Sequence, residues 1–381
     1  MKLTFYSFKE RIGTLKALAS ALQREGWTAV FALRDPVLTR ASLANLHCAV
    51  LPAPFWPHPA TVSKPTHTYA DVLVANGFAS AADAHALMQA WDAVFDMAKP
   101  DLLICENAPG AALAAFGRIA TAFVGNGSVV PPTDGAVFAP YKRIGSEPVS
   151  QEPVLAAMRD AVAQAGRSPP KSITEPFRGM FRAVYAFPEL DPYRATRRDL
   201  VLGPLESLPP LTPLPSARKF FAYSAGDYAL IEELTAALME LGPQASVYFR
   251  GALGARSAIL KSRGVTVFNE APRLGDVLPA ATCVFSHAGT GFTHAALAAG
   301  RPQIVSPRHS EADMTAKLLE DLGVAINIMP LERKRLREAI ERVSTEKKFQ
   351  IAAANMGERA HEFVAKAQAL ERTVAALTAL V

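Results

Sequence analysis

Residues Val284 to Gly323 read VFSHAGTGFTHAALAAGRPQIVSPRHSEADMTAKLLEDLG and are the most informative part of the chain about its fold. Its pattern is strand, glycine turn, helix, strand, helix, because short apolar runs alternate with segments of helical composition. The expected elements are the strand Thr282–Ser286, the helix Thr293–Ala299, the strand Gln303–Ser306 and the helix Ser310–Leu322. This alternation predicts a parallel α/β sheet.

The turn between the first strand and the first helix has the composition of an anion site. The start of a helix presents backbone N–H groups without intrahelical partners, together with a partial positive charge. Gly289 and Gly291 let an anion approach that backbone closely, and His287 can add a hydrogen bond or a charge. The turn therefore predicts a site for a phosphate or a diphosphate; a glycine turn that binds nothing is the alternative.

The order and spacing of the residues around this turn resemble a known signature. The matching positions are His287-x-Gly289-x-Gly291, Ala296-Leu297, Gly300-x-Pro302 and Pro307-x-x-x-Glu311. They are similar to the donor-binding signature of family 1 glycosyltransferases, the UDP-glycosyltransferase and macrolide glycosyltransferase group. The resemblance implies the GT-B fold, an α/β architecture of two Rossmann-like, doubly wound parallel-sheet domains that face a central cleft.

The resemblance also implies a reaction. The donor would be a UDP- or dTDP-linked sugar, and the acceptor would be the hydroxyl of a small molecule or a lipid. Transfer would invert the sugar carbon and would need neither a metal nor another cofactor. The implied donor-binding residues are His287, Gly289, Thr290, Gly291, Thr293, Glu311, Ser224 and Arg250, with Glu311 in the place of the family's sugar-binding acidic residue.

The chain departs from the family pattern at several places. The family usually has a small hydroxyl residue where Phe292 stands and a ribose-binding glutamate where Ala295 stands. It has an Asp-Gln pair at the positions of Glu311 and Ala312. Its catalytic histidine lies in the loop after the first strand, and that loop contains no histidine here. The identity of the general base is therefore open.

Glu106 is the leading candidate for the general base or its partner. It follows the predicted strand Leu102–Cys105, where the family has an acidic residue near the acceptor. The alternative is a structural carboxylate at the start of the next helix. Glu10, His58 and His67 are the other candidates for the base.

An aromatic loop, Pro52–Pro59, follows the predicted strand His47–Leu51 and carries Phe55, Trp56 and His58. Because loops at the C-terminal edge of a sheet carry binding residues, these three side chains are the predicted acceptor-binding residues. The alternative is that Phe55 and Trp56 cover the core.

The chain is long enough for two domains, each with its own core. The proline-rich segment GPLESLPPLTPLP, residues 203–215, is typical of a stiff connection between domains. The expected organisation is an acceptor-binding domain (1–202), a linker (203–217), a donor-binding domain (218–360) and a returning C-terminal helix (361–381). Within the first domain, Glu175–Arg182 is predicted to be helical.

The composition is that of a soluble globular protein, with 50% hydrophobic and 20% charged residues. The net charge of +5 is spread along the chain, which favours solvated helix faces over a nucleic-acid site. The three cysteines lie in apolar runs without metal-ligand spacing and predict buried thiols in a cytoplasmic protein. We expect no transmembrane segment, and peripheral membrane contact and the oligomeric state are open.

Three functions fit these features. The first is a glycosyltransferase, and the second is a non-catalytic GT-B auxiliary protein that stabilises an active partner. The third is another GT-B enzyme, such as a nucleotide-sugar epimerase. Hydrolysis by Ser224 is disfavoured because the glycine that a nucleophile elbow needs is missing before it.

Overall fold

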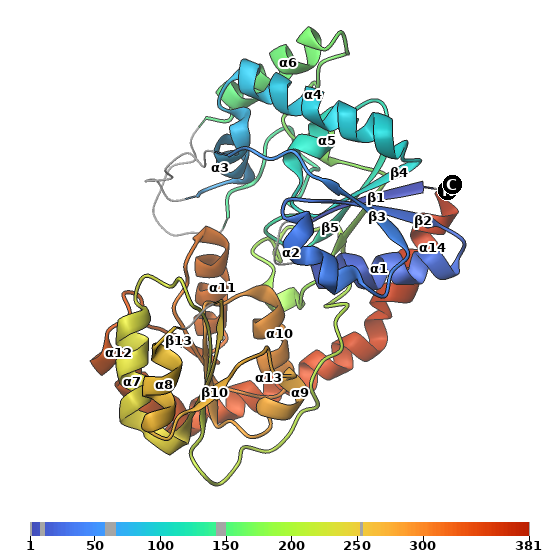
Figure 1. Cartoon of the computed structure of the whole chain (residues 1–381). Coiled ribbons are helices and arrows are strands. Elements are labelled where there is room, and N and C mark those ends of the chain that lie inside the picture. Colours follow the sequence, from blue (N-terminus) through green and yellow to red (C-terminus); the bar gives the residue numbers. More distant parts are fainter. Residues whose placement is uncertain (1, 8–11, 58–65, 142–149, 252–253, 381) are drawn as a thin grey trace. The chain divides into compact units, whose positions relative to one another are not determined.

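The computed structural model describes residues 2–7, 12–57, 66–141, 150–251 and 254–380 of the 381-residue chain. The chain divides into two compact units. Unit 1 consists of residues 1–206 and 368–381, and unit 2 consists of residues 207–367. Figure 1 labels their helices and strands.

Unit 1 is built on a parallel sheet of seven strands in the order β3-β2-β1-β4-β5-β6-β7. The strands are β1 (Lys2–Ser7), β2 (Thr28–Leu33), β3 (Cys48–Pro52), β4 (Leu102–Cys105), β5 (Ala120–Gly125), β6 (Phe181–Val184) and β7 (Leu200–Val201). The helices are α1 (Ile12–Arg24), α2 (Pro36–Thr39), α3 (Tyr69–Leu73), α4 (Ala81–Ala98), α5 (Pro109–Ala115), α6 (Glu152–Gln164) and α14 (Ala369–Ala379).

Strand β4 shows why this sheet is covered on both faces. Its side chains alternate, so Leu102 and Ile104 pack with α1, while Leu103 and Cys105 pack with α4 and α5. The C-terminal helix α14 lies beside α1 on the first face, and α4, α5 and α6 lie on the other (Figure 1). A continuous apolar run in a strand is what a doubly covered parallel sheet requires.

Unit 2 repeats the plan with six strands in the order β10-β9-β8-β11-β12-β13. The strands are β8 (Phe220–Ala225), β9 (Ala245–Arg250), β10 (Thr266–Phe268), β11 (Cys283–Ser286), β12 (Gln303–Val305) and β13 (Ala325–Asn327). The helices are α7 (Ile231–Leu241), α8 (Arg256–Ser262), α9 (Leu274–Val277), α10 (Thr290–Ala298), α11 (Ser310–Asp321), α12 (Arg333–Thr345) and α13 (Lys347–Ala367).

Both sheets have the doubly wound order in which the first strand lies between the second and the fourth. In such sheets ligands bind beyond the carboxyl ends of the strands, where the chain reverses direction across the sheet. That point lies between β1 and β4 in unit 1 and between β8 and β11 in unit 2. The topology thus directs attention to the loops that follow these four strands.

One expected helix is absent. Residues 175–182 form a short 3-10 turn, Glu175–Phe177, and strand β6 then begins at Phe181. Gly179 lies between them at φ +60°, and a Cβ there would come within 2.7 Å of the Thr121 carbonyl oxygen. The prediction of a helix at Glu175–Arg182 is wrong because the backbone turns tightly at Gly179 and then enters strand β6.

Among the described residues, none of the helices combines the length and the apolar character needed to cross a bilayer.

Candidate functional site

His287 lies at the reversal point of the unit 2 sheet, directly after β11. Its Nδ1 atom is 2.9 Å from the Ser306 carbonyl oxygen, and its Nε2 atom is 2.9 Å from the Ser224 hydroxyl. Because a carbonyl only accepts, Nδ1 carries the hydrogen, and Nε2 accepts from Ser224 and, at 3.4 Å, from the Ala225 backbone N–H. One neutral ring, directly after β11, therefore joins the end of β8 to the loop that follows β12.

Electrostatics also keep the His287 ring neutral. Burial is the main cause that lowers its pKa, to about 4, and the charges of Arg308 and Arg250 lower it further. The bond to the Ser306 carbonyl acts in the opposite direction but does not offset these causes. Of the two contributions expected from the sequence, this ring therefore supplies hydrogen bonding and no charge near pH 7.

This lowered pKa predicts how stability changes with pH. Unfolded histidine binds its proton near pH 6.5 and folded His287 near pH 4, so protonation favours the unfolded chain between these values. The wild type should therefore lose up to about 3 kcal/mol relative to His287→Gln as pH falls through this window. Denaturant unfolding of both proteins from pH 7 to pH 4 measures the difference, and a constant difference would contradict the assigned ring state.

The turn after His287 leaves the start of α10 open. Ala288 has φ +55°, and its N–H donates to the Ser286 hydroxyl at 3.1 Å, which sets the direction in which the helix begins. A Cβ placed on Gly289 or Gly291 would have no atom within 4 Å. The first-turn N–H groups of a helix have no intrahelical acceptor, so a ligand can reach them here.

The predicted donor residues Thr290 and Glu311 meet in the structure. The Thr290 hydroxyl is 3.3 Å from Glu311 Oε1, so the first turns of α10 and α11 lie side by side. Thr293, in contrast, is fully buried, and its hydroxyl has no hydrogen-bond partner among the described residues. The structure therefore groups Thr290 and Glu311 with the open turn and places Thr293 in the packed interior.

Two arginines bring positive charge to this edge. Arg250 is the last residue of β9, and Arg308 follows β12 with its guanidinium 3.0 Å from the Asp227 carboxylate. Hydrogen bonding to Arg308 is the main cause that lowers the pKa of Asp227. Arg308 and Asp227 were not predicted from the sequence; their positions after parallel strands, beside a predicted anion turn, were the available signal.

The two departures from the donor signature are packed side chains. Phe292 is 8% exposed and stacks on Tyr223, with ring centroids 5.2 Å apart. Ala295 is also buried and belongs with Phe292 to the core between α10 and the sheet. Neither residue offers a hydrogen-bonding group to a ligand at the open turn.

Glu106 lies at the reversal point of unit 1, directly after β4, and is 2% exposed. The end of β5 packs against it, since a Cβ on Gly125 would lie 3.4 Å from the Glu106 Cγ atom. The Arg197 side chain, buried and paired with Asp191, donates to the Gly127 carbonyl at 2.9 Å and holds the loop that follows β5. The carboxylate of Glu106 is therefore firmly placed and little exposed.

The aromatic loop is partly core. Trp56 packs on Gly77, where a Cβ would lie 3.0 Å from the indole ring, while Phe55 is 39% exposed beneath the Arg34 guanidinium. Both side chains line a cavity of about 10 Å³ that also reaches Ala108, near Glu106. It holds one water at most, so an acceptor there would have to displace side chains. Glu10 and His58 lie outside the described residues.

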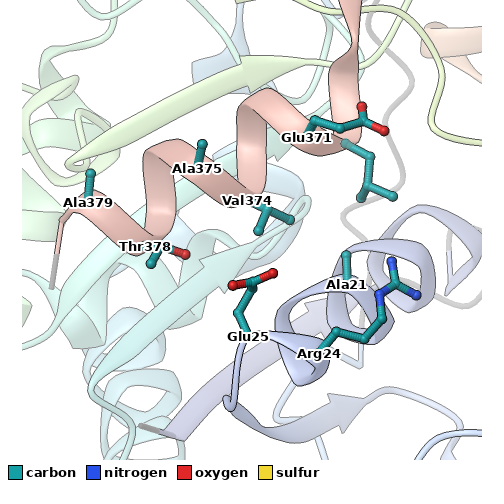
Figure 2. A pocket seen from close by; sticks show the side chains of 9 residues that line it. Ala21, Arg24, Glu25, Glu371, Val374, Ala375, Thr378 and Ala379 are labelled. Carbon is teal, nitrogen blue, oxygen red and sulfur yellow. The ribbon is translucent and has the colours of Figure 1, made fainter.

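A larger groove, of about 560 Å³, lies between α1 and α14 (Figure 2). Its lining residues are Ala21, Arg24, Glu25, Leu370, Glu371, Val374, Ala375, Thr378 and Ala379. Because α1 ends here and β2 then begins, the groove lies at the amino edge of the sheet. It is therefore separate from the edge that carries Glu106.

Comparison with known proteins agrees with this architecture. Residues 263–374 match the family model described as erythromycin biosynthesis protein CIII-like, C-terminal domain. CalG4, the calicheamicin glycosyltransferase, superposes with a TM-score of 0.70 at 17% identity, over 99% of this chain and 98% of that one. The chain has the GT-B fold. The resemblance to the macrolide glycosyltransferase group, stated from the sequence, is confirmed.

Other GT-B proteins superpose over nearly their whole length. The spinosyn rhamnosyltransferase SpnG, complexed with spinosyn aglycone, has a TM-score of 0.66 at 16% identity, covering 98% of this chain and 100% of that one. The glycosyltransferase VinC in complex with dTDP has a TM-score of 0.63 at 15% identity, covering 98% and 99%.

A curated relative matches over a short stretch only. The sterol 3-beta-glucosyltransferase of Komagataella phaffii is 36% identical over 73 residues, which are 19% of this chain and 6% of that protein.

Proposed function

We propose that this GT-B protein is a glycosyltransferase that moves a sugar from a UDP- or dTDP-linked donor to an acceptor hydroxyl, with inversion and without a metal. The observation that carries the proposal is the open start of α10 at the reversal point of unit 2, directly after His287, on which the charges of Arg250 and Arg308 act. The dTDP complex of VinC and the aglycone complex of SpnG support the two substrate classes.

In this reaction the bond between the sugar carbon and the phosphate oxygen breaks, and its electron pair leaves with the nucleoside diphosphate. The N–H groups at the start of α10 and the nearby guanidinium groups stabilise that charge. His287 holds the surrounding segments in place through its bonds to Ser224 and Ser306. Glu311 accepts hydrogen bonds from sugar hydroxyls. The acceptor oxygen forms the new bond and gives its proton to a base, for which Glu106 is the candidate.

The auxiliary protein remains the second candidate, and one observation favours it. Glu106 is 2% exposed, and a general base has to come within hydrogen-bond reach of the acceptor. An auxiliary GT-B protein would keep a structural carboxylate at this place and would bind a nucleotide without turning it over.

Turnover distinguishes the two. We expect the protein to release UDP or dTDP from one member of a nucleotide-sugar panel when acceptor alcohols are supplied, and the product to have the opposite anomeric configuration. Nucleotide binding without any release, across acceptors of increasing size and apolarity, would instead support the auxiliary protein.

A further inference from the structure

Three loops of unit 2 form a fixed frame around His287. Besides the bonds of the ring to Ser224 and Ser306, the Tyr228 hydroxyl lies 2.6 Å from the Ser306 hydroxyl. The Tyr228 ring also packs on the imidazole, with centroids 4.4 Å apart. The loops after β8 and β12 therefore hold each other in register through side chains behind the open turn of α10.

Asp227 and Arg308 project from this frame. Asp227 precedes Tyr228, and Arg308 follows Ser306 by two residues, so each is tied closely to the hydrogen-bonded core of the frame. Their ion pair of 3.0 Å is exposed: the side chain of Asp227 is 80% exposed and that of Arg308 is 30% exposed. The guanidinium is thus open to solvent, two residues after Ser306, whose carbonyl bonds the His287 ring.

The site needs positive charge that His287 does not supply. A helix start contributes only about half an elementary charge, and a diphosphate carries more negative charge than that. The chargeable groups whose positive charge acts on His287 are Arg308, Arg250 and His309. The Arg308 guanidinium binds the carboxylate of Asp227, and guanidinium groups bind carboxylates and phosphates alike.

Exposed ion pairs stabilise a protein little, so the pair Asp227–Arg308 is readily exchanged for a stronger partner. We propose that Arg308 is a ligand of the donor diphosphate and that Asp227 competes with the diphosphate for the same guanidinium. The inference deepens the proposed function and rests on it, because it assigns the charge at the same donor site. It gives the two members of one ion pair opposite effects on affinity.

The test is a double-mutant cycle read by calorimetric titration. Arg308→Gln should weaken UDP or dTDP binding about ten-fold or more, because it removes charge-assisted hydrogen bonds. Asp227→Asn should tighten binding about two- to five-fold, because it releases the guanidinium. The double variant should bind far more weakly than Asp227→Asn and close to Arg308→Gln, since Arg308 is the main partner of Asp227.

Matched controls come from the opposite edge of the same sheet. Arg218 and Glu341 form an exposed ion pair of 2.7 Å before β8, so Arg218→Gln and Glu341→Gln should leave the affinity unchanged. Thermal unfolding of each variant checks that the fold is retained. Unchanged affinity in Arg308→Gln, or unchanged or weaker binding in Asp227→Asn, would overturn the inference.

Titration with inorganic pyrophosphate separates this inference from the proposed function. Pyrophosphate binding that depends on Arg308, without binding of any nucleotide, would sustain the diphosphate ligand and overturn the nucleotide-sugar donor. Nucleotide binding that is unchanged in Arg308→Gln and Asp227→Asn would sustain the nucleotide-sugar donor and overturn the role of Arg308. If the wild type binds neither pyrophosphate nor nucleotide, both fail.

Discussion

Replacing His287 by alanine should lower turnover about 100-fold, because the three loops that surround the open turn lose their common partner. The substitution removes the donor to the Ser306 carbonyl and the acceptor for the Ser224 hydroxyl, so both groups lose their bonds to the ring. Small displacements of groups that position a reacting phosphate cost factors of this size. Steady-state kinetics with a nucleotide-sugar donor measure the loss.

The fold of the His287→Ala variant should survive at reduced stability. We expect a loss of about 2–4 kcal/mol in the free energy of unfolding, from unpaired polar groups and a small cavity. His361→Ala is the matched control, since the His361 ring bonds the Ala298 carbonyl at the far end of the same helix, at 3.1 Å. It should lower stability and leave turnover unchanged. Wild-type turnover in His287→Ala would remove His287 from the donor site.

Replacing Glu106 by glutamine should lower kcat by about 10²–10⁴, the usual contribution of a general base. Donor affinity should not change, because Glu106 belongs to unit 1 and the donor turn belongs to unit 2. The isosteric amide keeps the packing against Gly125 at the end of β5, so stability should change little. Single-turnover kinetics together with calorimetry separate the two quantities.

Glu206→Gln is the control for that substitution. Glu206 accepts a hydrogen bond from Thr14 at 2.9 Å in the same unit but follows no strand of the reversal point. It should leave kcat at the wild-type level. A wild-type kcat in Glu106→Gln would instead place the base elsewhere and leave Glu106 as a structural carboxylate.

The fold was predictable because the residues that end its helices and strands are recognisable in the local sequence. From Val284 to Gly323, glycine and proline mark the ends of β11, α10 and β12, and all four expected elements are present within a few residues. The segments Ile12–Arg24 and Glu152–Gln164 also have apolar residues at helical spacing, and both are helices in the structure. The prediction of a helix at residues 175–182 was wrong because the pairing of β6 with β5 is a long-range contact, which the local helical composition does not reveal.

The site was less predictable because its contacts join distant loops. The sequence singled out His287 and Ser224 separately, but the bond between them spans 63 positions and follows from the adjacency of β8 and β11. The neutral state of His287 depends on burial and on two arginines distant in the sequence, one at the end of β9 and one in the loop after β12. Nothing in the local sequence indicates that Asp227 and Arg308 form an ion pair. The packing of Trp56 on Gly77 could not be predicted from the sequence either.

The central claim is that the start of α10 in unit 2 binds the diphosphate of a nucleotide. Calorimetric titration of the wild type with UDP and dTDP, each beside its monophosphate, tests it most directly. We predict that one diphosphate binds at least about ten-fold more tightly than its monophosphate, because the second phosphate reaches the helix start and Arg308. Equal affinity of the two, or no binding of either nucleotide, would contradict it.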